Sequence, residues 1–425
     1  MKRYILFLLT LSCIRAIGQE IPLNYYLERA LDNNPALKEN SNLKEIANLQ
    51  EKISLAQENA FKIDITSELG VYPYISNNGR LVSISTNPSA GAFGYDVGIT
   101  NGGLYSLQLN VTRNIFNQGI LDNLRLKQKI ERQSIALSSE EIKHNLIKNI
   151  TDNYIVAYQY QLQIDLLKRL LADLDIRLKV VELLVKKGIL SESDYMLLQL
   201  DINTRKLELS QVSTKYGDAL AQLDNLAGIP LDSTQFQLRD PAIELSDTPQ
   251  SYFYQRKFNN DSLMVVTDQL VYENKYKPRI ETYANTGLNA VELPNIYHKI
   301  GIGAGIRLAI PVFDGKQREK TAMQSELLRK NLLYHRQAAD VQKQNSLIAI
   351  QKQLSDLTKN IADLKMQLEE QQKIIVIYKS KLVQGQASII DYLNVLQNYK
   401  MNEYALLQMK TNAQLLKNQF NYLNW

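Results

Sequence analysis

The stretch VQGQASIIDYL (Val383–Leu393) places a single glycine six residues before an Asp-Tyr pair. The stretch KKGILSESDYM (Lys186–Met196) repeats this arrangement, and the two glycines, Gly188 and Gly385, are 197 positions apart. Glycine suits a reversal between two helices because it adopts positive φ without steric cost. The two stretches therefore predict helix-to-helix turns at equivalent positions of an internal repeat.

Each predicted turn ends a long segment that contains neither glycine nor proline. No glycine lies between Gly119 and Gly188, nor between Gly315 and Gly385, which leaves windows of 68 and 69 residues. A helix of that length would reach roughly 100 Å, at about 1.5 Å per residue. Apolar residues in both windows recur at alternating steps of three and four, which is typical of a coiled coil. The matched series run over Ile150–Val185 and Leu347–Leu382.

Before each long helical segment the apolar pattern changes to alternation of apolar and polar residues, more weakly from Arg279 than elsewhere, which predicts β-strands. Four segments show it, at residues 61–71, 105–112, 280–288 and 300–310. Each has about the length of a tilted membrane-crossing strand, roughly 9 to 11 residues, with one apolar and one polar face. A hairpin half-buried on a soluble core would alternate in the same way, but helices of this length offer no globular core.

Four strands are too few to close a membrane barrel, because the smallest spanning barrels have about eight. An open sheet edge in hydrocarbon would leave backbone groups without hydrogen-bond partners. If these strands cross a membrane, several copies of the chain must therefore share one barrel.

The first 20 residues, MKRYILFLLTLSCIRAIGQE, predict a secretory signal peptide over residues 1–18. Its removal would lower the formal charge of the 425-residue chain from +5 to +2, because it contains Lys2, Arg3 and Arg15. A charge so close to neutral gives no reason to expect nucleic acid as a partner. After the signal, no apolar run is long enough for a membrane-spanning helix.

Cysteine and histidine usage gives no sign of a metal or redox site. The only cysteine, Cys13, lies in the signal, and Thr10 replaces the leucine that a lipidation signal would carry three residues earlier. Lipidation is therefore not expected, and the mature chain has neither disulfides nor thiolate chemistry. His144, His298 and His335 are far apart in the sequence. We accordingly predict no metal site and no cofactor.

The order of these features resembles one known family. The signal is followed by PLNYYLERALDNNPALKE (Pro22–Glu39), a strand hairpin, FNQG (Phe116–Gly119), a long helix, GILSESDY (Gly188–Tyr195) and a return helix that ends in NLAG (Asn225–Gly228). All but the opening motif then recurs. This order resembles the TolC family of outer-membrane efflux channels over essentially the whole mature chain. The single motifs are common in proteins, whereas their order and the 197-residue spacing are specific.

The resemblance implies a mixed fold with an internal duplication. Each chain would give four outer-membrane β-strands to a trimeric twelve-stranded β-barrel, and its long antiparallel coiled-coil helices would form a periplasmic α-barrel. The first structural repeat is expected at residues 19–230, with a β-hairpin at about 61–116 and a helical hairpin at about 117–228. A linker at 231–250 would precede the second repeat, 251–425, with its β-hairpin at about 277–312 and helical hairpin at about 314–425.

The same resemblance implies a passive duct and no catalysis. A homotrimer in the lipid of the outer membrane would extend its helical tube into the periplasm. There it would dock a periplasmic adaptor (membrane fusion) protein and an inner-membrane pump of the RND, ABC or MFS type, for efflux or type I secretion. The expected adaptor contacts are the residues of the two turns: Lys186, Lys187, Gly188, Ile189, Gln384, Gly385, Gln386 and Ala387.

A pore constriction is expected at Asp391 and Asn394. In the family two aspartates, three positions apart, narrow the entrance, and here the second position is Asn394. A trimer would therefore carry one ring of carboxylates, which favours cations. The alternative is that Asp391 only caps its helix, as is expected of its counterpart Asp194, and that the turns have no partner.

Three other protein classes remain less favoured. A periplasmic helical-hairpin adaptor should carry a compact β-rich domain split around its hairpin, and no such segment is present. A secreted coiled-coil scaffold would not need four alternating strands. An enzyme is disfavoured because nothing resembles a nucleophile elbow, a phosphate loop or a metal triad.

Overall fold

The computed structural model describes residues 20–71, 73–83, 89–94, 103–230, 237–246, 253–290 and 296–425. The predicted signal peptide, with Cys13, and half of the predicted linker lie outside these ranges. The chain divides into two compact units. Unit 1 comprises the described parts of Met1–Ser41, Leu137–Arg256 and His335–Trp425, and unit 2 comprises those of Asn42–Ala136 and Lys257–Tyr334. Both units draw on both predicted repeats, because each of the longest helices contributes to both.

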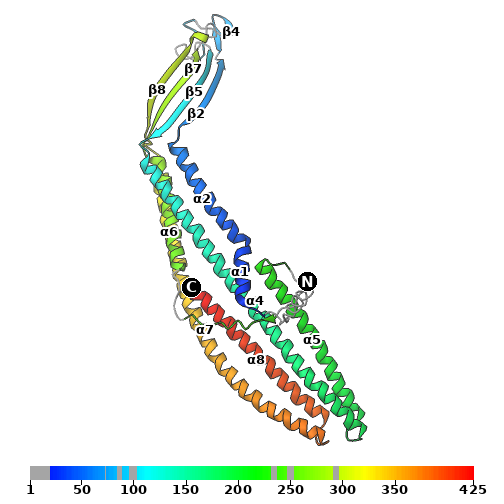
Figure 1. Ribbon diagram of the computed structural model, residues 1–425. Helices are drawn as coiled ribbons and strands as arrows, with labels where there is room; N and C mark the ends of the chain where they lie inside the picture. Colours follow the sequence, from blue (N-terminus) through cyan, green and yellow to red (C-terminus); the bar gives the residue numbers. More distant parts are fainter. Residues whose placement is uncertain are drawn as a thin grey trace, which may run out of the picture. The chain divides into compact units, whose positions relative to one another are not determined.

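Long helices dominate the chain (Figure 1). The α-helices are α1 (Leu23–Asn33), α2 (Pro35–Asn59), α4 (Gln118–Lys186), α5 (Glu192–Ala227), α6 (Phe253–Glu273), α7 (Gln317–Val383) and α8 (Ile389–Leu423), with short 3₁₀ turns η1 (Asn274–Tyr276) and η2 (Ile296–His298). The strands are β1 (Glu20–Ile21), β2 (Lys62–Val71), β3 (Tyr74–Asn77), β4 (Arg80–Ser83), β5 (Gly103–Ile115), β6 (Gln237–Leu238), β7 (Arg279–Ala290) and β8 (Ile300–Ala309). No helix in the described ranges is both long enough and apolar enough to span a membrane.

Unit 2 contains an antiparallel four-stranded sheet in the order β2-β5-β7-β8. Residues that lie opposite each other share a face, and the register aligns Ile65 with Leu109, Leu109 with Thr286, and Thr286 with Ile302. The face that carries these residues is largely apolar, and yet Ile302 is 89% exposed. The other face carries Asp64, Thr66 and Asn110 among others. Among the described residues, each outer strand, β2 and β8, pairs on one side only.

A second, smaller hairpin of unit 2, β3–β4, was not predicted from the sequence. Asn78 and Gly79 form its turn, with φ of 51° and 78°. Asn-Gly in this conformation matches the right-handed twist of the two strands. Two large apolar side chains near this turn, Leu81 and Phe93, are exposed.

Polar contacts join the helices of unit 2. Arg132 on α4 forms an ion pair with Glu51 on α2. Lys127, one turn earlier on α4, lies with its Nζ 2.9 Å from Oδ1 of Asp268 on α6. At the start of α4, Asn117 Nδ2 donates to the carbonyl of Glu58 at 2.6 Å. These contacts orient the helices directly below the sheet within this unit.

Unit 1 has a core where α1, α4 and α5 meet, with Ile150, Tyr154 and Leu223 fully buried. The hydroxyl of Tyr154 lies 2.7 Å from the carbonyl oxygens of both Ile21 and Arg239. It thereby holds the parallel pair of short strands, β1 and β6, against α4.

A second core of unit 1 lies where the two helical hairpins approach their turns. Figure 1 shows α5 beside α4 and α8 beside α7, and buried residues of all four helices form one cluster. Leu174, Leu198, Leu382 and Leu396 represent the four helices in it. The predicted apolar series thus faces inward at this end of both hairpins.

Candidate functional site: the two hairpin tips

The first turn closes α4 with a Schellman arrangement. Gly188 has φ of 71°, its N–H donates to the carbonyl of Val185 at 2.9 Å, and the N–H of Ile189 donates to that of Leu184 at 2.9 Å. Ser191 then caps α5, with its Oγ accepting from the backbone N–H of Asp194 while the Asp194 carboxylate accepts from the Ser191 N–H. This reciprocal capping box fixes where α5 begins.

The second turn has the same glycine closure and serine N-cap, without the reciprocal capping box. Gly385 has φ of 70°, its N–H donates to the carbonyl of Leu382 at 3.1 Å, and the N–H of Gln386 donates to that of Lys381 at 2.9 Å. Ser388 Oγ accepts from the backbone N–H of Asp391 at 3.1 Å and donates to Asp391 Oδ2 at 2.8 Å. The stretches Lys186–Met196 and Val383–Leu393 therefore form two closely matched tips.

The two tips touch each other. A Cβ placed on Gly385 would lie 2.9 Å from Cγ2 of Ile189, whereas one placed on Gly188 would meet nothing within 4 Å. The second glycine is thus required by its neighbour as well as by its φ. The contact joins the tips into one surface, with the shared core of Leu198 and Leu396 beneath it.

Nearly all the predicted contact residues are exposed on this surface. Only Ala387 is half-buried. Lys186 Nζ lies 2.8 Å from Glu182 Oε1, and this hydrogen bond raises the pKa of the Lys186 ammonium. The surface therefore combines cationic, amide and apolar side chains around Ile189.

Asp391 and Asn394 are both exposed and lie one helical turn apart on α8. Between them Tyr392 is fully buried, and burial raises the pKa of its phenol. Its hydroxyl donates to Oδ2 of Asp173 on α4 at 3.1 Å, and Lys379 on α7 donates to Oδ1 of the same carboxylate at 2.6 Å. One carboxylate thus holds three helices together just behind the predicted constriction.

The sequence did not predict these polar contacts. It also did not predict a second set of polar contacts between α5 and α8, farther from the tips. Arg205 of α5 is 1% exposed, with its Nε 3.0 Å from Asp201 Oδ2 and an NH2 donating to Gln397 Oε1 of α8 at 3.1 Å. Lys400 Nζ of α8 lies 2.9 Å from Glu208 Oε2 of α5. The available signal was the position of Arg205, which interrupts an apolar series on α5.

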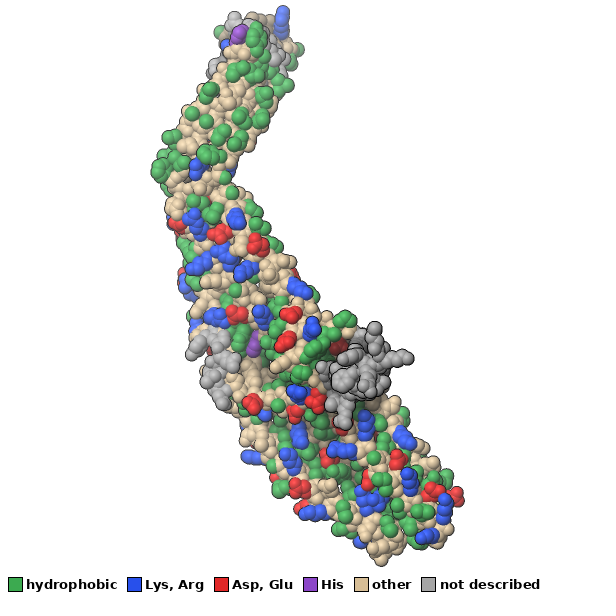
Figure 2. Space-filling view, in the orientation of Figure 1, with side chains coloured by type: hydrophobic (Ala, Val, Ile, Leu, Met, Phe, Trp, Pro, Cys, Tyr) green, Lys and Arg blue, Asp and Glu red, His purple; other side chains and the backbone are tan. Residues whose placement is uncertain are grey.

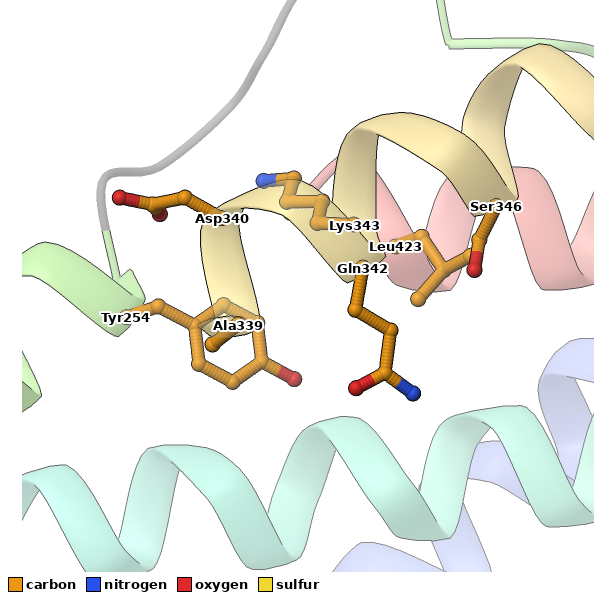
Figure 3. A pocket seen from close by; sticks show the side chains of 7 residues that line it. All are labelled: Tyr254, Ala339, Asp340, Gln342, Lys343, Ser346 and Leu423. Atoms are coloured by element: carbon orange, nitrogen blue, oxygen red, sulfur yellow. The ribbon is translucent and has the colours of Figure 1, made fainter. Parts of the chain in front are cut away.

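Unit 1 also has two hollows that are lined by residues outside the hairpin tips. One, of about 210 Å³, lies between α6, α7 and α8 and is drawn in Figure 3. It is lined by Tyr254, Ala339, Asp340, Gln342, Lys343, Ser346 and Leu423. Burial lowers the pKa of the Lys343 ammonium, which donates to the carbonyl of Trp425 at 3.3 Å. The polar side chains that line this hollow are not arranged as a catalytic nucleophile and base.

The other hollow, of about 410 Å³, lies beside an aromatic stack. The ring of His144 lies between those of Tyr422 and Trp425, at centroid distances of 4.6 and 3.9 Å. Burial lowers the pKa of His144. Across the described residues, no group of three or more histidine, cysteine or acidic side chains is arranged to hold a metal ion.

Comparison with solved structures identifies the fold. CusC, studied for its conformational changes on folding and transmembrane channel formation, matches with a TM-score of 0.74 over 96% of this chain and 95% of its own. The chain has the fold of the TolC-family channels. VceC, an outer membrane protein of Vibrio cholerae, shares this TolC-family fold with a TM-score of 0.70, covering 95% of each chain.

A third relative in fold is the CmeC outer membrane channel of Campylobacter jejuni, with a TM-score of 0.69 over 95% of this chain and 85% of its own. The sequence identities to CusC, VceC and CmeC are 12%, 14% and 15%, so the likeness is one of fold. No family model matches the sequence, and no curated protein matches it.

Proposed function

We propose that this protein is the outer-membrane channel of an export complex and serves as the passive exit duct for efflux or type I secretion. The observation that carries the proposal is agreement with solved channels over nearly the full length of both chains. The sheet of unit 2 would cross the outer membrane, and the long helices would extend into the periplasm.

Three copies would complete the sheet. In one chain the apolar face is exposed and the outer strands, β2 and β8, each have a free edge. Pairing β2 of each copy with β8 of the next would close twelve strands, turn the apolar face to lipid and satisfy the edge hydrogen bonds. This arrangement supports a homotrimer.

An internal duplication accounts for the matched halves. Helices α4 and α7 have 69 and 67 residues, and α5 and α8 have 36 and 35. The capping Ser-Asp pairs Ser191–Asp194 and Ser388–Asp391 recur at the same spacing as the glycines. A duplicated ancestral unit explains why both tips share one construction.

The tips would dock the periplasmic adaptor, which in turn would connect the duct to an RND, ABC or MFS pump in the inner membrane. Support comes from the construction of the surface, in which both turns are hydrogen-bonded, in contact with each other and exposed. A preorganised surface loses little conformational entropy on binding. We place the adaptor contacts at Lys186, Lys187, Gly188, Ile189, Gln384, Gly385, Gln386 and Ala387.

Asp391 and Asn394 would narrow the pore at its periplasmic end. The N-cap of α8 is Ser388, whose Oγ accepts from the Asp391 N–H and donates to the Asp391 carboxylate, so Asp391 can support the cap and also face the pore. Its side chain is exposed, and three copies around an axis would form one carboxylate ring.

Electron microscopy of the detergent-extracted protein from an outer-membrane fraction tests the proposal. We expect three-fold, tapered hollow particles longer than about 100 Å, since the longest helices rise about 1.5 Å per residue. Single-copy rods without a barrel, or recovery from the soluble fraction, would contradict the duct and favour the adaptor or scaffold alternatives.

A further inference from the structure

Large apolar side chains are exposed where the strands of unit 2 meet its helices. Phe116 and Phe313 are each 86% exposed, and Val312 is 94% exposed. Phe61 and Ile310 are exposed beside them. Figure 2 shows hydrophobic side chains over the sheet and gathered at its helix-proximal end. We call these five residues the strand-end belt.

The strand-end belt lies at one end of the sheet. Phe61 precedes β2, Phe116 follows β5, and Ile310 to Phe313 follow β8. The register sets Ile115 opposite Ile280 and Ile280 opposite Leu308, so these strand ends lie level with one another. The belt therefore continues the apolar face of the sheet up to the helices.

The backbone at Phe116 argues against a water-facing role. Its φ is 56°, a left-handed conformation that is disfavoured for residues other than glycine, asparagine and aspartate. A polar residue or glycine would be favoured there in water, on both conformational and solvation grounds. The equivalent position of the second repeat, Phe313, is also phenylalanine.

Two cations accompany the belt. Arg113 is the one charged residue that the four described strands carry on the apolar face. Its guanidinium lies 4.7 Å from the centroid of the Phe61 ring, and its Nε donates to the Asn59 carbonyl at 3.1 Å. Lys316 follows Phe313 by three residues and is exposed. Neither forms an ion pair with any residue that the structure describes. Aromatic rings beside lysine and arginine are typical of a membrane interface, where such cations meet lipid phosphates.

We propose that Arg113 and Lys316 bind the phosphates of anionic phospholipids where the strand-end belt meets the headgroups of the periplasmic leaflet. This inference rests on the proposed function, because the helices define the periplasmic side. That side also selects phospholipid over lipopolysaccharide, which would meet the opposite end of the sheet.

Depth-dependent quenching tests the position of the belt. The only tryptophan, Trp425, is replaced by phenylalanine, and single tryptophans are introduced as Phe313→Trp and Ile302→Trp. The full-length protein is reconstituted in phosphatidylcholine brominated either near the ester or near the methyl end of its chains. We expect the Phe313→Trp fluorescence to be quenched more by the shallow bromines and the Ile302→Trp fluorescence more by the deep ones.

The two tryptophans separate the possible failures. If neither is quenched, the sheet does not enter lipid and the proposed function itself fails. If only Ile302→Trp is quenched, the sheet spans the membrane but the belt is covered by another copy or lies in water, and the inference is overturned.

Lipid selectivity tests the cations. The double variant Arg113→Gln, Lys316→Gln should lose about fivefold in phosphatidylglycerol binding for each cation removed, measured by native mass spectrometry against phosphatidylcholine. The matched control is Arg80→Gln, Lys299→Gln, which removes two exposed cations from the opposite end of the sheet. Lys316→Gln alone serves if loss of the Arg113 contacts impairs folding. An equal loss in the control, or none in either variant, would overturn the assignment.

Discussion

Gly385 and Gly188 have nearly equal φ but different surroundings, which makes them a matched pair of test positions. Alanine at either site meets the left-handed backbone penalty of about 1 kcal/mol. Only at Gly385 does the new methyl group also press on Ile189. We expect Gly385→Ala to destabilise the folded protein by about 0.5–1.5 kcal/mol more than Gly188→Ala, because Ile189 must leave its present rotamer, as measured by denaturant unfolding.

Removing the neighbour provides the control for this prediction. In an Ile189→Ala background the methyl group at Gly385 has room, so the two alanine variants should lose similar stability. Equal losses in the wild-type background would show that the tips do not contact each other in solution.

The stability of the folded protein should depend on pH because of His144. Burial lowers its pKa in the folded protein below the ordinary 6.5, so the unfolded chain binds a proton at higher pH than the folded one. The stabilisation from the neutral ring is therefore complete above pH 6.5 and falls as the pH drops below it. Comparing unfolding midpoints at about pH 7.5 and about pH 5.5 measures this loss.

The matched variant is His144→Phe, which keeps an aromatic ring between Tyr422 and Trp425 but has no proton to bind. Its midpoint should fall less on acidification than that of the wild type. A wild-type midpoint that falls no further than that of the variant would assign the acid sensitivity to other groups.

At the scale of elements, buried charges link α5 to α8. Arg205→Ala removes a buried guanidinium and leaves Asp201, whose side chain is 21% exposed, and the exposed Gln397 without their partner, and we expect a loss of about 1–3 kcal/mol. Lys330→Ala is the control, since its ion pair with Glu326 is exposed on a single helix and should contribute nothing measurable. Denaturant unfolding compares the two, and similar losses would contradict the burial argument.

Much of the element pattern follows from the sequence. Absence of glycine and proline indicated α4 and α7, and alternation indicated the four strands of the sheet. Two signals were overlooked. Pro35 ends α1, because proline disfavours helical ψ at the preceding residue and Asn34 has ψ of 120°. Asn78-Gly79 marks the β3–β4 turn.

Other features had no usable local signal. The two-residue strands β1 and β6 pair across more than 200 positions, and their register depends on Tyr154 and the helices beneath. The contact of Ile189 with Gly385 and the sharing of Asp173 by Tyr392 and Lys379 likewise depend on how the hairpins align. Periodicity places residues on a helix face but does not determine which residue on a neighbouring helix they meet.

At the scale of the whole molecule, the proposed carboxylate ring makes a prediction for conductance. Asp391→Asn keeps a polar side chain beside the N-cap residue Ser388 but removes one charge from each of three copies. In planar bilayers at low salt we expect the preference for cations over anions to fall by about twofold or more.

Asp194→Asn is the control, because Asp194 occupies the equivalent position at the start of α5, three residues after the N-cap Ser191. Its conductance and ion preference should match the wild type. If both variants behave alike, Asp391 only supports the Ser388 cap and the constriction lies elsewhere.

The free edges of β2 and β8 also bear on biogenesis. In the proposed homotrimer, a newly exported copy would present two strand edges that no described strand pairs and an uncovered apolar face, so it would be an aggregation hazard until other copies arrive. Its stability is then inseparable from protomer concentration. Assembly would then compete with aggregation, and the yield of assembled channels would depend on which is faster. A periplasmic chaperone that covers the sheet during transit would raise this yield.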